Sequence, residues 1–418
     1  MQPTDRSSPI DIAIVGAGAA GLATGIFAAR RDPSPRIVAL DGAAKLGAKI
    51  LISGGGRCNV THRVVSADDY CGGNVHLVRR ILAALPVEAT IRFFREIGVS
   101  LHEEENGKLF PDTNRARTVL DALLGEARRL GIEIRCGRRV TAIERCDEGF
   151  HLSIGGESLT VRKVVLATGG LSYPKTGSDG TGYQFASSLG HTLTPTTPAL
   201  APLILDGDFH TALSGIAHEV ELTIRPADGK AVRIRGPMLW THFGISGPAA
   251  LDASRHWHRA RIEQRGVTVS ASFLPGESFE TAEAGLVAKA GAQPRALLHT
   301  VLSGMLPARV AAAVLKYLRI GERVQTAHLT RDDRRRLVRG LLEWPLPILE
   351  SRGYAHAEVT AGGVPLTEVN AATMESRVCP GLYLVGEILD VEGRLGGFNF
   401  QWAWCTGFVA ASGLTRPG

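Results

Sequence analysis

The chain has 418 residues, of which 44% are hydrophobic and 21% are charged, and its formal net charge is +6. This length exceeds what one hydrophobic core usually serves, so we expect two or three domains. The balance of charged and apolar residues excludes a disordered or fibrous protein.

An uncharged run near the start of the chain, residues 12–29, has the length of a signal peptide or a membrane span. Four glycines interrupt it, Arg6 is balanced by Asp5 and Asp11, and no cleavage pattern follows. We therefore expect a cytoplasmic protein without membrane attachment. The cysteines form no CxxC pair or zinc-type spacing, which indicates free thiols and predicts no metal site.

The segment 10–41 predicts a strand, a glycine turn, a helix and a second strand. Gly16, Gly18 and Gly21 follow the apolar strand and open the alanine-rich helix, which is the context of a dinucleotide-binding fingerprint. In this motif Gly16 permits the tight turn, Gly18 lets a pyrophosphate approach the backbone, and Gly21 lets the helix pack on the strand.

The residues around the fingerprint favour the interpretation that this turn binds a ligand. We expect the first helical turn, including Ala19 and Ala20, to present free N–H groups to phosphate. Asp41 ends the second strand twenty residues after Gly21, where its carboxylate can accept hydrogen bonds from ribose hydroxyls. The alternative is a glycine-rich turn that binds nothing, which the strand, the helix and the acid at fitting positions disfavour.

A run of three glycines follows Lys49, in the segment Ser53, Gly54, Gly55, Gly56, Arg57, Cys58 and Asn59. Consecutive glycines lose much backbone entropy on folding. The run is typical of a loop whose N–H groups approach a ligand, with Arg57 as a charge partner and Asn59 as both donor and acceptor. A flexible surface loop is the alternative.

Two amphipathic helices are expected over 74–98, the second opened by Pro86, followed by a hairpin turning at 106–107 and a helix over 116–130. Three short strands then predict an antiparallel meander, beginning at Val140 and ending in Thr168, Gly169 and Gly170. In flavoproteins with two dinucleotide folds, such an ending returns the chain to the nucleotide. We therefore count Val140 and these three residues among the expected cofactor-binding residues.

Prolines 195, 198 and 202 indicate a domain boundary. Residues 200–275 predict short strands in a small β-barrel or sandwich, 278–340 are helical, and strand patterns return from Tyr354. We expect an α/β fold with a discontinuous Rossmann-like domain. Its expected parts are 1–198 and 354–418, interrupted by a β-barrel over 199–277 and a helical subdomain over 278–353.

The end of the chain favours FAD. Gly386 and Glu387 end a strand, and Gly396, Gly397, Phe398 and Asn399 precede a closing helix. The acid can hold the ribityl chain or a phosphate through water, and the helix start can face the pyrimidine edge of a flavin. A nucleotide site completed by both ends of the chain is common for FAD, whereas NAD sites usually lie within one half.

The sequence resembles, along nearly its full length, the BaiN/RdsA (YhiN-like) family of bacterial FAD flavoproteins. The matching stretches are AIVGAGAAGL, KILISGGGRCNVTH, LATGG, YPKTGSDGTGY, THFGISGPA, VTAGGV and MESRVCPGLYLVGEILDVEGRLGGFNFQWAWCTG. The resemblance implies a two-part FAD domain, with the fingerprint at the pyrophosphate, Asp41 at the adenosine ribose, and 54–59 at the flavin. Family members are linked to reduction of a conjugated steroid double bond, reduction of a uridine in large-subunit ribosomal RNA, and amine oxidation.

The reaction itself is less defined by the residues. No Ser-His-Asp, HExxH or paired-carboxylate pattern occurs, and for Tyr173, Lys175, His242 and Cys405 a structural role competes with a catalytic one, so no proton donor is assigned. No second fingerprint follows, so a nicotinamide donor would dock transiently. We expect an FAD-dependent reductase that uses NAD(P)H on an electron-poor C=C bond of a small molecule. The alternatives are a uridine reductase acting on ribosomal RNA, an amine oxidase, or a non-catalytic FAD-binding protein.

Positive charge is concentrated in one segment. Between Arg295 and Arg339 there are ten Lys or Arg and three acidic residues, a local charge of +7. A basic face is the expected footprint of nucleic-acid binding, so RNA contact through the Arg331–Arg339 helix is one hypothesis. A solvated surface helix is the other.

Overall fold

The computed structural model describes residues 10–321 and 323–415. They fall into two compact units: unit 1 combines the residues up to Thr196 with those from Val359 onward, and unit 2 is Thr197–Glu358. Within unit 2, the Glu358 N–H donates to the Leu200 carbonyl at 3.2 Å. The entry and exit segments of the inserted unit are therefore joined to each other.

Unit 1 is built on a sheet with strand order β7-β2-β1-β10-β9-β8, and β20 also pairs with β10. The strands are β1 (Ile10–Val15), β2 (Ile37–Leu40), β7 (Glu133–Arg135), β8 (Val140–Cys146), β9 (Gly149–Ile154), β10 (Glu157–Leu166) and β20 (Leu382–Leu384). The pairs β7/β2, β2/β1, β1/β10 and β10/β20 are parallel, and β8, β9 and β10 form the antiparallel meander. The expected Rossmann-like α/β fold is confirmed.

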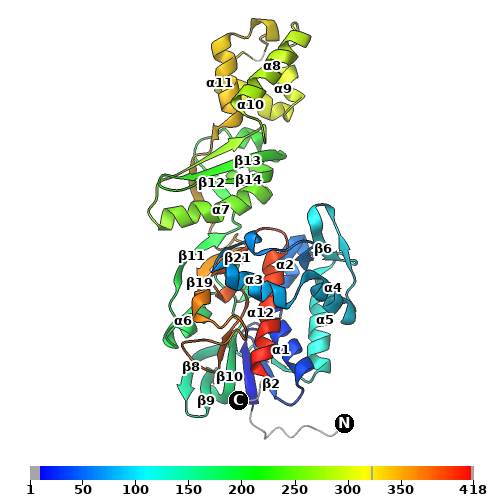
Figure 1. Ribbon diagram of the computed structural model, residues 1–418, viewed down its shortest axis with the longest axis vertical. Helices are drawn as coiled ribbons and strands as arrows, with labels where there is room; N and C mark the ends of the chain where they lie inside the picture. Colours follow the sequence, from blue (N-terminus) through cyan, green and yellow to red (C-terminus); the bar gives the residue numbers. More distant parts are fainter. Residues whose placement is uncertain (1–9, 322, 416–418) are drawn as a thin grey trace. The chain divides into compact units, whose positions relative to one another are not determined.

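Within the described part of unit 1, seven α-helices surround this sheet or extend from it: α1 (Ala19–Arg31), α2 (Ala48–Gly56), α3 (Val75–Ala84), α4 (Val87–Glu96), α5 (Ala116–Arg129), α6 (Thr181–Ser188) and α12 (Phe398–Leu414). α1 and α12 lie side by side (Figure 1). Most residues of both helices are buried, as expected for helices that are largely apolar all round. A Cβ atom placed on Gly407 would lie 3.0 Å from the Thr24 nitrogen, so this glycine allows the close packing.

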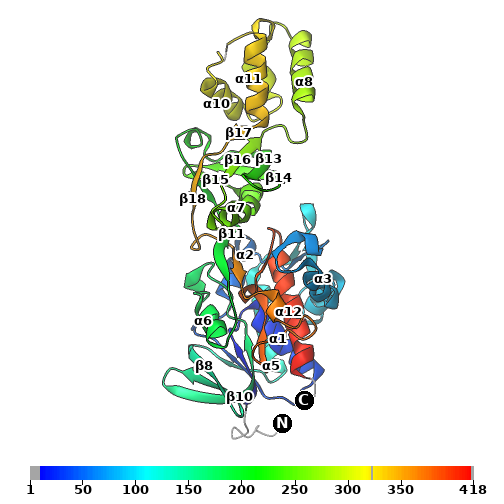
Figure 2. The ribbon, with the colours of Figure 1, turned by 60° about the vertical axis from the view of Figure 1, so that its left-hand side comes forward.

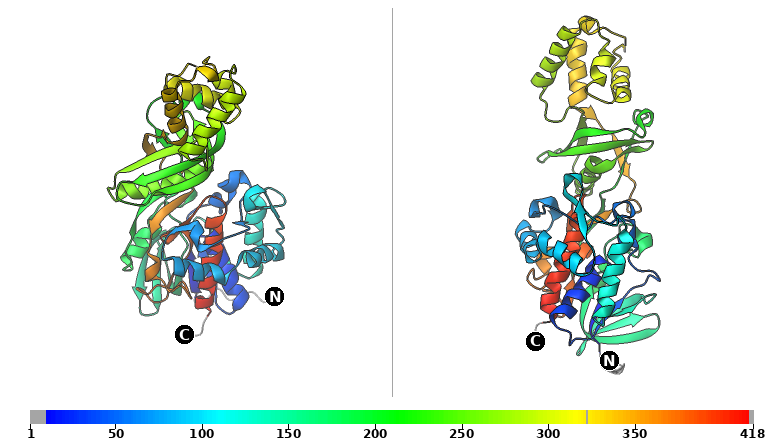
Figure 3. Two further views of the ribbon diagram at one scale, coloured as in Figure 1. Left: turned by 45° about the horizontal axis from the view of Figure 1, so that its top comes forward. Right: turned by 90° about the vertical axis from the view of Figure 1, so that its right-hand side faces the viewer.

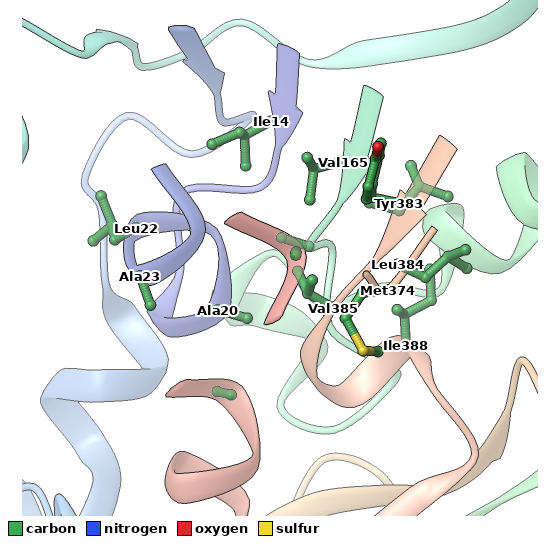
Figure 4. Packing of buried hydrophobic residues seen from close by; sticks show 14 of the residues in the cluster. Ile14, Ala20, Leu22, Ala23, Val165, Met374, Tyr383, Leu384, Val385 and Ile388 are labelled. Carbon is green, nitrogen blue, oxygen red and sulfur yellow. The ribbon is translucent and has the colours of Figure 1, made fainter. Parts of the chain in front are cut away.

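The core of unit 1 joins the two ends of its chain. Ile14 of β1, Val165 of β10 and Tyr383 of β20 are buried on adjacent strands, and Ala20 of α1 lies beside the end of β20 (Figure 4). Parallel strands covered on both faces need continuous apolar runs, which explains the sequence of β1.

The described part of unit 1 also contains three smaller sheets. They consist of β3 (Thr61–His62), β6 (Lys108–Pro111) and β5 (Leu101–Glu103); of β4 (Tyr70–Gly72) and β21 (Val391–Gly393); and of β11 (Thr194–Ala199) and β19 (Val359–Gly363). The first contains the expected hairpin, with its turn at Asn106 in a left-handed conformation (φ +73°).

Unit 2 contains a second sheet of order β17-β16-β13-β14-β15-β12-β18 (Figure 2). Its strands are β12 (Leu203–Leu205), β13 (Ala217–Pro226), β14 (Val232–Thr241), β15 (Gly244–Ser246), β16 (Val267–Ser272), β17 (Trp344–Pro345) and β18 (Ile348–Ser351). The two ends of this order, β17 and β18, are consecutive segments of chain. One stretch therefore pairs with β16 at its start and with β12 at its end, which closes the sheet in the manner of a barrel.

Two expectations for unit 2 were wrong in detail. Residues 200–275 were expected to form short strands of a small β-barrel or sandwich with no helix among them, but α7 (Gly247–Ile262) lies there and packs its buried Ala249, Ala253 and Trp257 on the sheet. Pro248 in its first turn and this apolar spacing are helix signals. The expected helical subdomain also ends earlier than 353, because 344–351 belongs to the barrel.

The helical part of unit 2 consists of α8 (Phe279–Ala292), α9 (Leu298–Ser303), α10 (Ala308–Tyr317) and α11 (Arg331–Leu342), which pack against one another (Figure 3, right). Ser278 and Thr330 cap α8 and α11 by accepting hydrogen bonds from the third helical N–H. Across residues 10–321 and 323–415, no helix is both long enough and apolar enough for a membrane span.

Candidate functional site

Glycine is needed at the three fingerprint positions of unit 1 for different structural reasons. A Cβ atom on Gly16 (φ +102°) would lie 2.4 Å from the Ala167 carbonyl oxygen, and one on Gly21 would lie 2.0 Å from the Gly16 carbonyl oxygen. Gly18 is extended (φ −82°), and a Cβ atom there would have no other segment within 4 Å. Packing therefore explains Gly16 and Gly21, whereas Gly18 borders open space at the start of α1, where free N–H groups attract an anion.

Asp41 joins the fingerprint to the end of β2. Its two carboxylate oxygens accept hydrogen bonds from the Ala17 N–H at 2.9 Å and the Ala43 N–H at 2.8 Å. Each oxygen keeps a second lone pair for a ribose hydroxyl. The Arg138 N–H donates to the Asp41 carbonyl at 2.8 Å, which brings the segment before the buried Val140 to the same place.

The glycine run after Lys49 ends α2 in a left-handed path. Gly54, Gly55 and Gly56 have φ of +55°, +68° and +86°, which L-residues with side chains adopt at a cost. All three are exposed, and a Cβ on Gly55 would have no other segment within 4 Å. Cys58 is buried, and burial raises the pKa of its thiol to about 12, so it is not a reactive group.

Arg57 does not face open space as an unpaired charge. Its guanidinium forms an ion pair with Glu104 and lies 4.1 Å from the centre of the Phe110 ring. The hairpin therefore supplies a partner for Arg57 within unit 1, and its role as a charge partner of a ligand stays a prediction.

Among the described residues, the buried polar atoms without a hydrogen-bond partner include Asn59 Oδ1 and Thr168 Oγ1. Both belong to segments expected to bind the cofactor. Asn59 Oδ1 would lie 2.8 Å from a Cβ on Gly397, the residue before α12, so the two ends of the chain meet here. Buried polar atoms are usually hydrogen-bonded, and a ligand donor would satisfy them.

Lys49 and Glu387 form an ion pair between two recognised motifs. Lys49 Nζ lies 2.6 Å from Glu387 Oε2, and the side chains are 28% and 18% exposed. Glu387 Oε1 accepts hydrogen bonds from Ser172 Oγ at 2.9 Å and the Thr360 N–H at 3.0 Å. A Cβ on Gly170 would lie 2.5 Å from Thr360 Oγ1 and 2.9 Å from Glu387 Oε1, so this network requires that glycine.

Sequence reasoning missed Ser172 and Thr360. Each lies within two residues of a glycine pair that was recognised, Gly169-Gly170 and Gly362-Gly363. A hydroxyl beside a glycine pair was the available signal, but its acidic partner is distant in the sequence.

The end of β20 touches the fingerprint helix. Gly386 (φ +75°) lies so close to α1 that a Cβ on it would be 2.8 Å from the Ala20 Cβ. Its N–H donates to Thr406 Oγ1 and its carbonyl accepts from Trp402 Nε1, both on α12. These contacts hold Glu387 beside the first turn of α1.

The last expected residues have partners inside unit 1. The buried Phe398 ring stacks on His62 at 4.8 Å, and the Asn399 amide exchanges two hydrogen bonds with the Gly393 backbone at 2.8 and 3.0 Å. Gly396 (φ +132°) and Gly397 (φ +92°) turn the chain into α12. Asn399 therefore fixes this turn through its side chain.

The catalytic candidates remain unassigned. Cys405 is buried, accepts from Gln401 at 3.3 Å and donates to the Leu85 carbonyl, and burial raises its pKa to about 12. His242 belongs to unit 2, and Lys175 is exposed. Tyr173 has a left-handed backbone (φ +49°) directly after Ser172. No group of three His, Cys, Asp or Glu in the described ranges could hold a metal ion.

Comparison with known proteins adds independent information. The family described as "HI0933-like protein Rossmann domain" matches residues 10–413. The chain is 33% identical over 407 residues to a "3-dehydro-bile acid delta(4,6)-reductase" of Clostridium scindens, covering 97% of this chain and 99% of that protein. It is 35% identical over 404 residues to a "Ribosomal RNA dihydrouridine synthase" of Escherichia coli, covering 97% and 98%.

Among solved structures, an E. coli quinol fumarate reductase matches with a TM-score of 0.52 and 17% identity, over 98% of this chain and 70% of that one. The 3-ketosteroid delta1-dehydrogenase of Sterolibacterium denitrificans matches with a TM-score of 0.50 and 12% identity, over 98% and 99%. These similarities concern the fold.

Proposed function

Because the chain belongs to the HI0933-like family, we propose that unit 1 binds FAD and that the protein is an oxidoreductase that reduces an electron-poor C=C bond. Family membership confirms the resemblance indicated by the sequence motifs.

The observation that carries the proposal is the meeting of motifs from both parts of unit 1. A Cβ atom would lie 2.4 Å from the Ala167 carbonyl oxygen if placed on Gly16, 2.8 Å from the Ala20 Cβ if placed on Gly386, and 2.8 Å from Asn59 Oδ1 if placed on Gly397. Each of these three positions holds a glycine, and the absence of a side chain there lets the two segments approach closely. A dinucleotide that runs along such a line would use the backbone N–H groups of each segment in turn.

The residues present fit FAD. Gly18 and the first turn of α1 would receive the pyrophosphate, Asp41 the adenosine ribose, and Gly55, Asn59 and Gly397 the flavin end. The partnerless Asn59 Oδ1 offers an acceptor for a ligand N–H. When bound, FAD supplies hydride transfer, and the protein supplies binding and orientation.

The substrate is proposed to be a small molecule with a C=C bond conjugated to a carbonyl group. The Clostridium scindens relative is named as a reductase of a bile acid derivative, which is a compound of this class. NAD(P)H is the proposed electron donor, docking transiently.

Anaerobic mixing tests both proposals. NADH or NADPH should bleach the bound flavin, and a conjugated enone should restore its colour, while a saturated ketone, as control, should not. Bleaching by a primary amine but by neither nicotinamide would favour the amine oxidase alternative.

A uridine base in ribosomal RNA is the second candidate, because the E. coli and Haemophilus influenzae relatives are named ribosomal RNA dihydrouridine synthases. Its double bond is also conjugated to a carbonyl group. Arg334 and Arg336 of α11 are already paired with Glu283 and Asp333, which leaves less free charge for phosphates than the sequence suggested. Loss of dihydrouridine from large-subunit RNA after gene deletion would reverse our ranking.

A further inference from the structure

Hydrogen bonds hold the charged groups of the Lys49–Glu387 ion pair in place. Glu387 accepts on both oxygens, from Lys49 Nζ on one and from Ser172 and Thr360 on the other. Thr360 Oγ1 in turn accepts from the Leu171 and Ser172 N–H groups at 2.7 and 3.1 Å. The carboxylate is therefore held by groups from three separate segments, and it cannot turn away without breaking several hydrogen bonds.

This pair adjoins the proposed FAD-binding segments. Gly386, next to Glu387, contacts Ala20 in the first turn of α1. Lys49 Nζ would lie 4.0 Å from a Cβ on Gly169, and Lys49 precedes the left-handed glycine run on α2. Both charges are partly withdrawn from water, so screening by solvent is reduced.

We infer that the Lys49–Glu387 pair balances the charge beside bound FAD and thereby sets its reduction potential. The inference rests on the proposed FAD binding. Two electrons and one proton convert oxidised FAD to its anionic reduced form, which carries one more negative charge. An uncompensated carboxylate nearby disfavours that form, and an uncompensated ammonium favours it.

The inference predicts opposite effects for the two halves of the pair. Lys49→Met leaves the Glu387 charge alone and should lower the midpoint potential of FAD. Glu387→Gln leaves the Lys49 charge alone and should raise it. The double variant removes both charges and should return toward the wild-type potential, so the two single effects should cancel.

The test is an anaerobic redox titration of each holoprotein against reference dyes, followed by the flavin absorbance. Lys49→Arg, which keeps the charge, is the matched control and should retain the wild-type value. Arg30→Met serves as a distant control, because it removes a positive charge about 18 Å along α1 from Gly18. It should leave the potential unchanged.

A purely structural tether gives a different pattern. Both single variants would then shift the potential in the same direction or leave it unchanged, and the double variant would be no closer to wild type. Should the single variants lose FAD, the double variant decides: recovery of FAD and potential supports charge balance, and continued loss refutes it. A wild-type protein without FAD would refute the proposed function instead, before any potential is measured.

Discussion

The glycine-rich end of unit 1 and the arginine-rich helix of unit 2 differ in how their unusual residues are accounted for. In unit 1, Gly16 and Gly21 are required by packing, but Gly18 and Gly55 border open space. In unit 2, Arg334 and Arg336 are paired within the unit. Packing within the unit therefore leaves Gly18 and Gly55 unexplained, and our proposal assigns them to the cofactor, whereas neighbouring residues account for the charges of Arg334 and Arg336.

The largest expected effect comes from comparing two glycines of the fingerprint. Gly21→Val forces a Cβ atom onto the Gly16 carbonyl oxygen, so we expect a loss of roughly 3 kcal/mol in the free energy of unfolding, together with loss of FAD. Gly18→Val has room and an extended backbone, so unit 1 should unfold as in wild type but retain no FAD. Thermal unfolding of the apoproteins and FAD content measure the two effects. If Gly18→Val retained FAD, the open space beside Gly18 would not be the place where the pyrophosphate binds.

Two fully buried tryptophans give a matched comparison of the units. Trp240 of β14 and Trp404 of α12 are each 0% exposed, and truncation to alanine should cost about 3–5 kcal/mol in either unit. Only Trp404→Ala should release FAD, because Trp404 Nε1 donates to the Val60 carbonyl beside Asn59 at 2.9 Å. Denaturant unfolding and FAD content would show this. Loss of FAD from Trp240→Ala at a temperature where unit 1 stays folded would contradict the assignment of the cofactor to unit 1.

The third prediction tests the arginine helix. Arg331, Arg335 and Arg339 are exposed and spaced by four residues, so they share one face of α11, and the guanidinium groups of Arg335 and Arg339 lie 5.7 and 6.0 Å from the centre of the Phe279 ring. If RNA binds there, changing all three to Gln should weaken binding and reduce the slope of log affinity against log salt by about 2. FAD content should not change. The control is a variant with Gln in place of three exposed arginines outside α11, Arg117, Arg128 and Arg225.

The smallest expected effect concerns the scaffold of unit 1 under acid. Hydrogen bonds from Arg129 and Arg30 hold the pKa of Glu126 at about 2, below its usual 4.5. Because the pKa is lowered on folding, this stabilisation is present above pH 4.5 and is lost as the pH falls toward 2. Glu126 is buried, but its partner Arg129 is 65% exposed, so screening by solvent reduces this contribution to about 2 kcal/mol. Glu126→Gln should therefore lower stability at pH 7 and leave it nearly unchanged at pH 2, in denaturant titrations at both values.

Much of unit 1 could be predicted because its signals are local. The spacing of Gly16, Gly18 and Gly21 between an apolar strand and a helix defines one supersecondary unit, and Asp41 follows at a fixed distance. The two helices expected over 74–98 from their amphipathic pattern and from Pro86 are present at Val75–Ala84 and Val87–Glu96.

The remaining features depend on contacts between distant residues. Arg57 appeared free because Glu104 lies 47 positions away, and Ser172 and Thr360 gained meaning only through Glu387. α7 was missed because Gly247-Pro248 also fits a turn, and the choice of helix depends on a sheet against which Trp257 can pack. Pairing partners of this kind do not follow from single-sequence patterns.

The central claim is that unit 1 holds FAD without a covalent bond, and the cofactor content of the purified protein tests it most directly. We predict a yellow protein whose flavin is released by denaturation and chromatographs as FAD, with about one FAD per chain after reconstitution. A colourless protein that takes up no FAD on reconstitution, while showing the cooperative unfolding of a folded chain, would contradict the account.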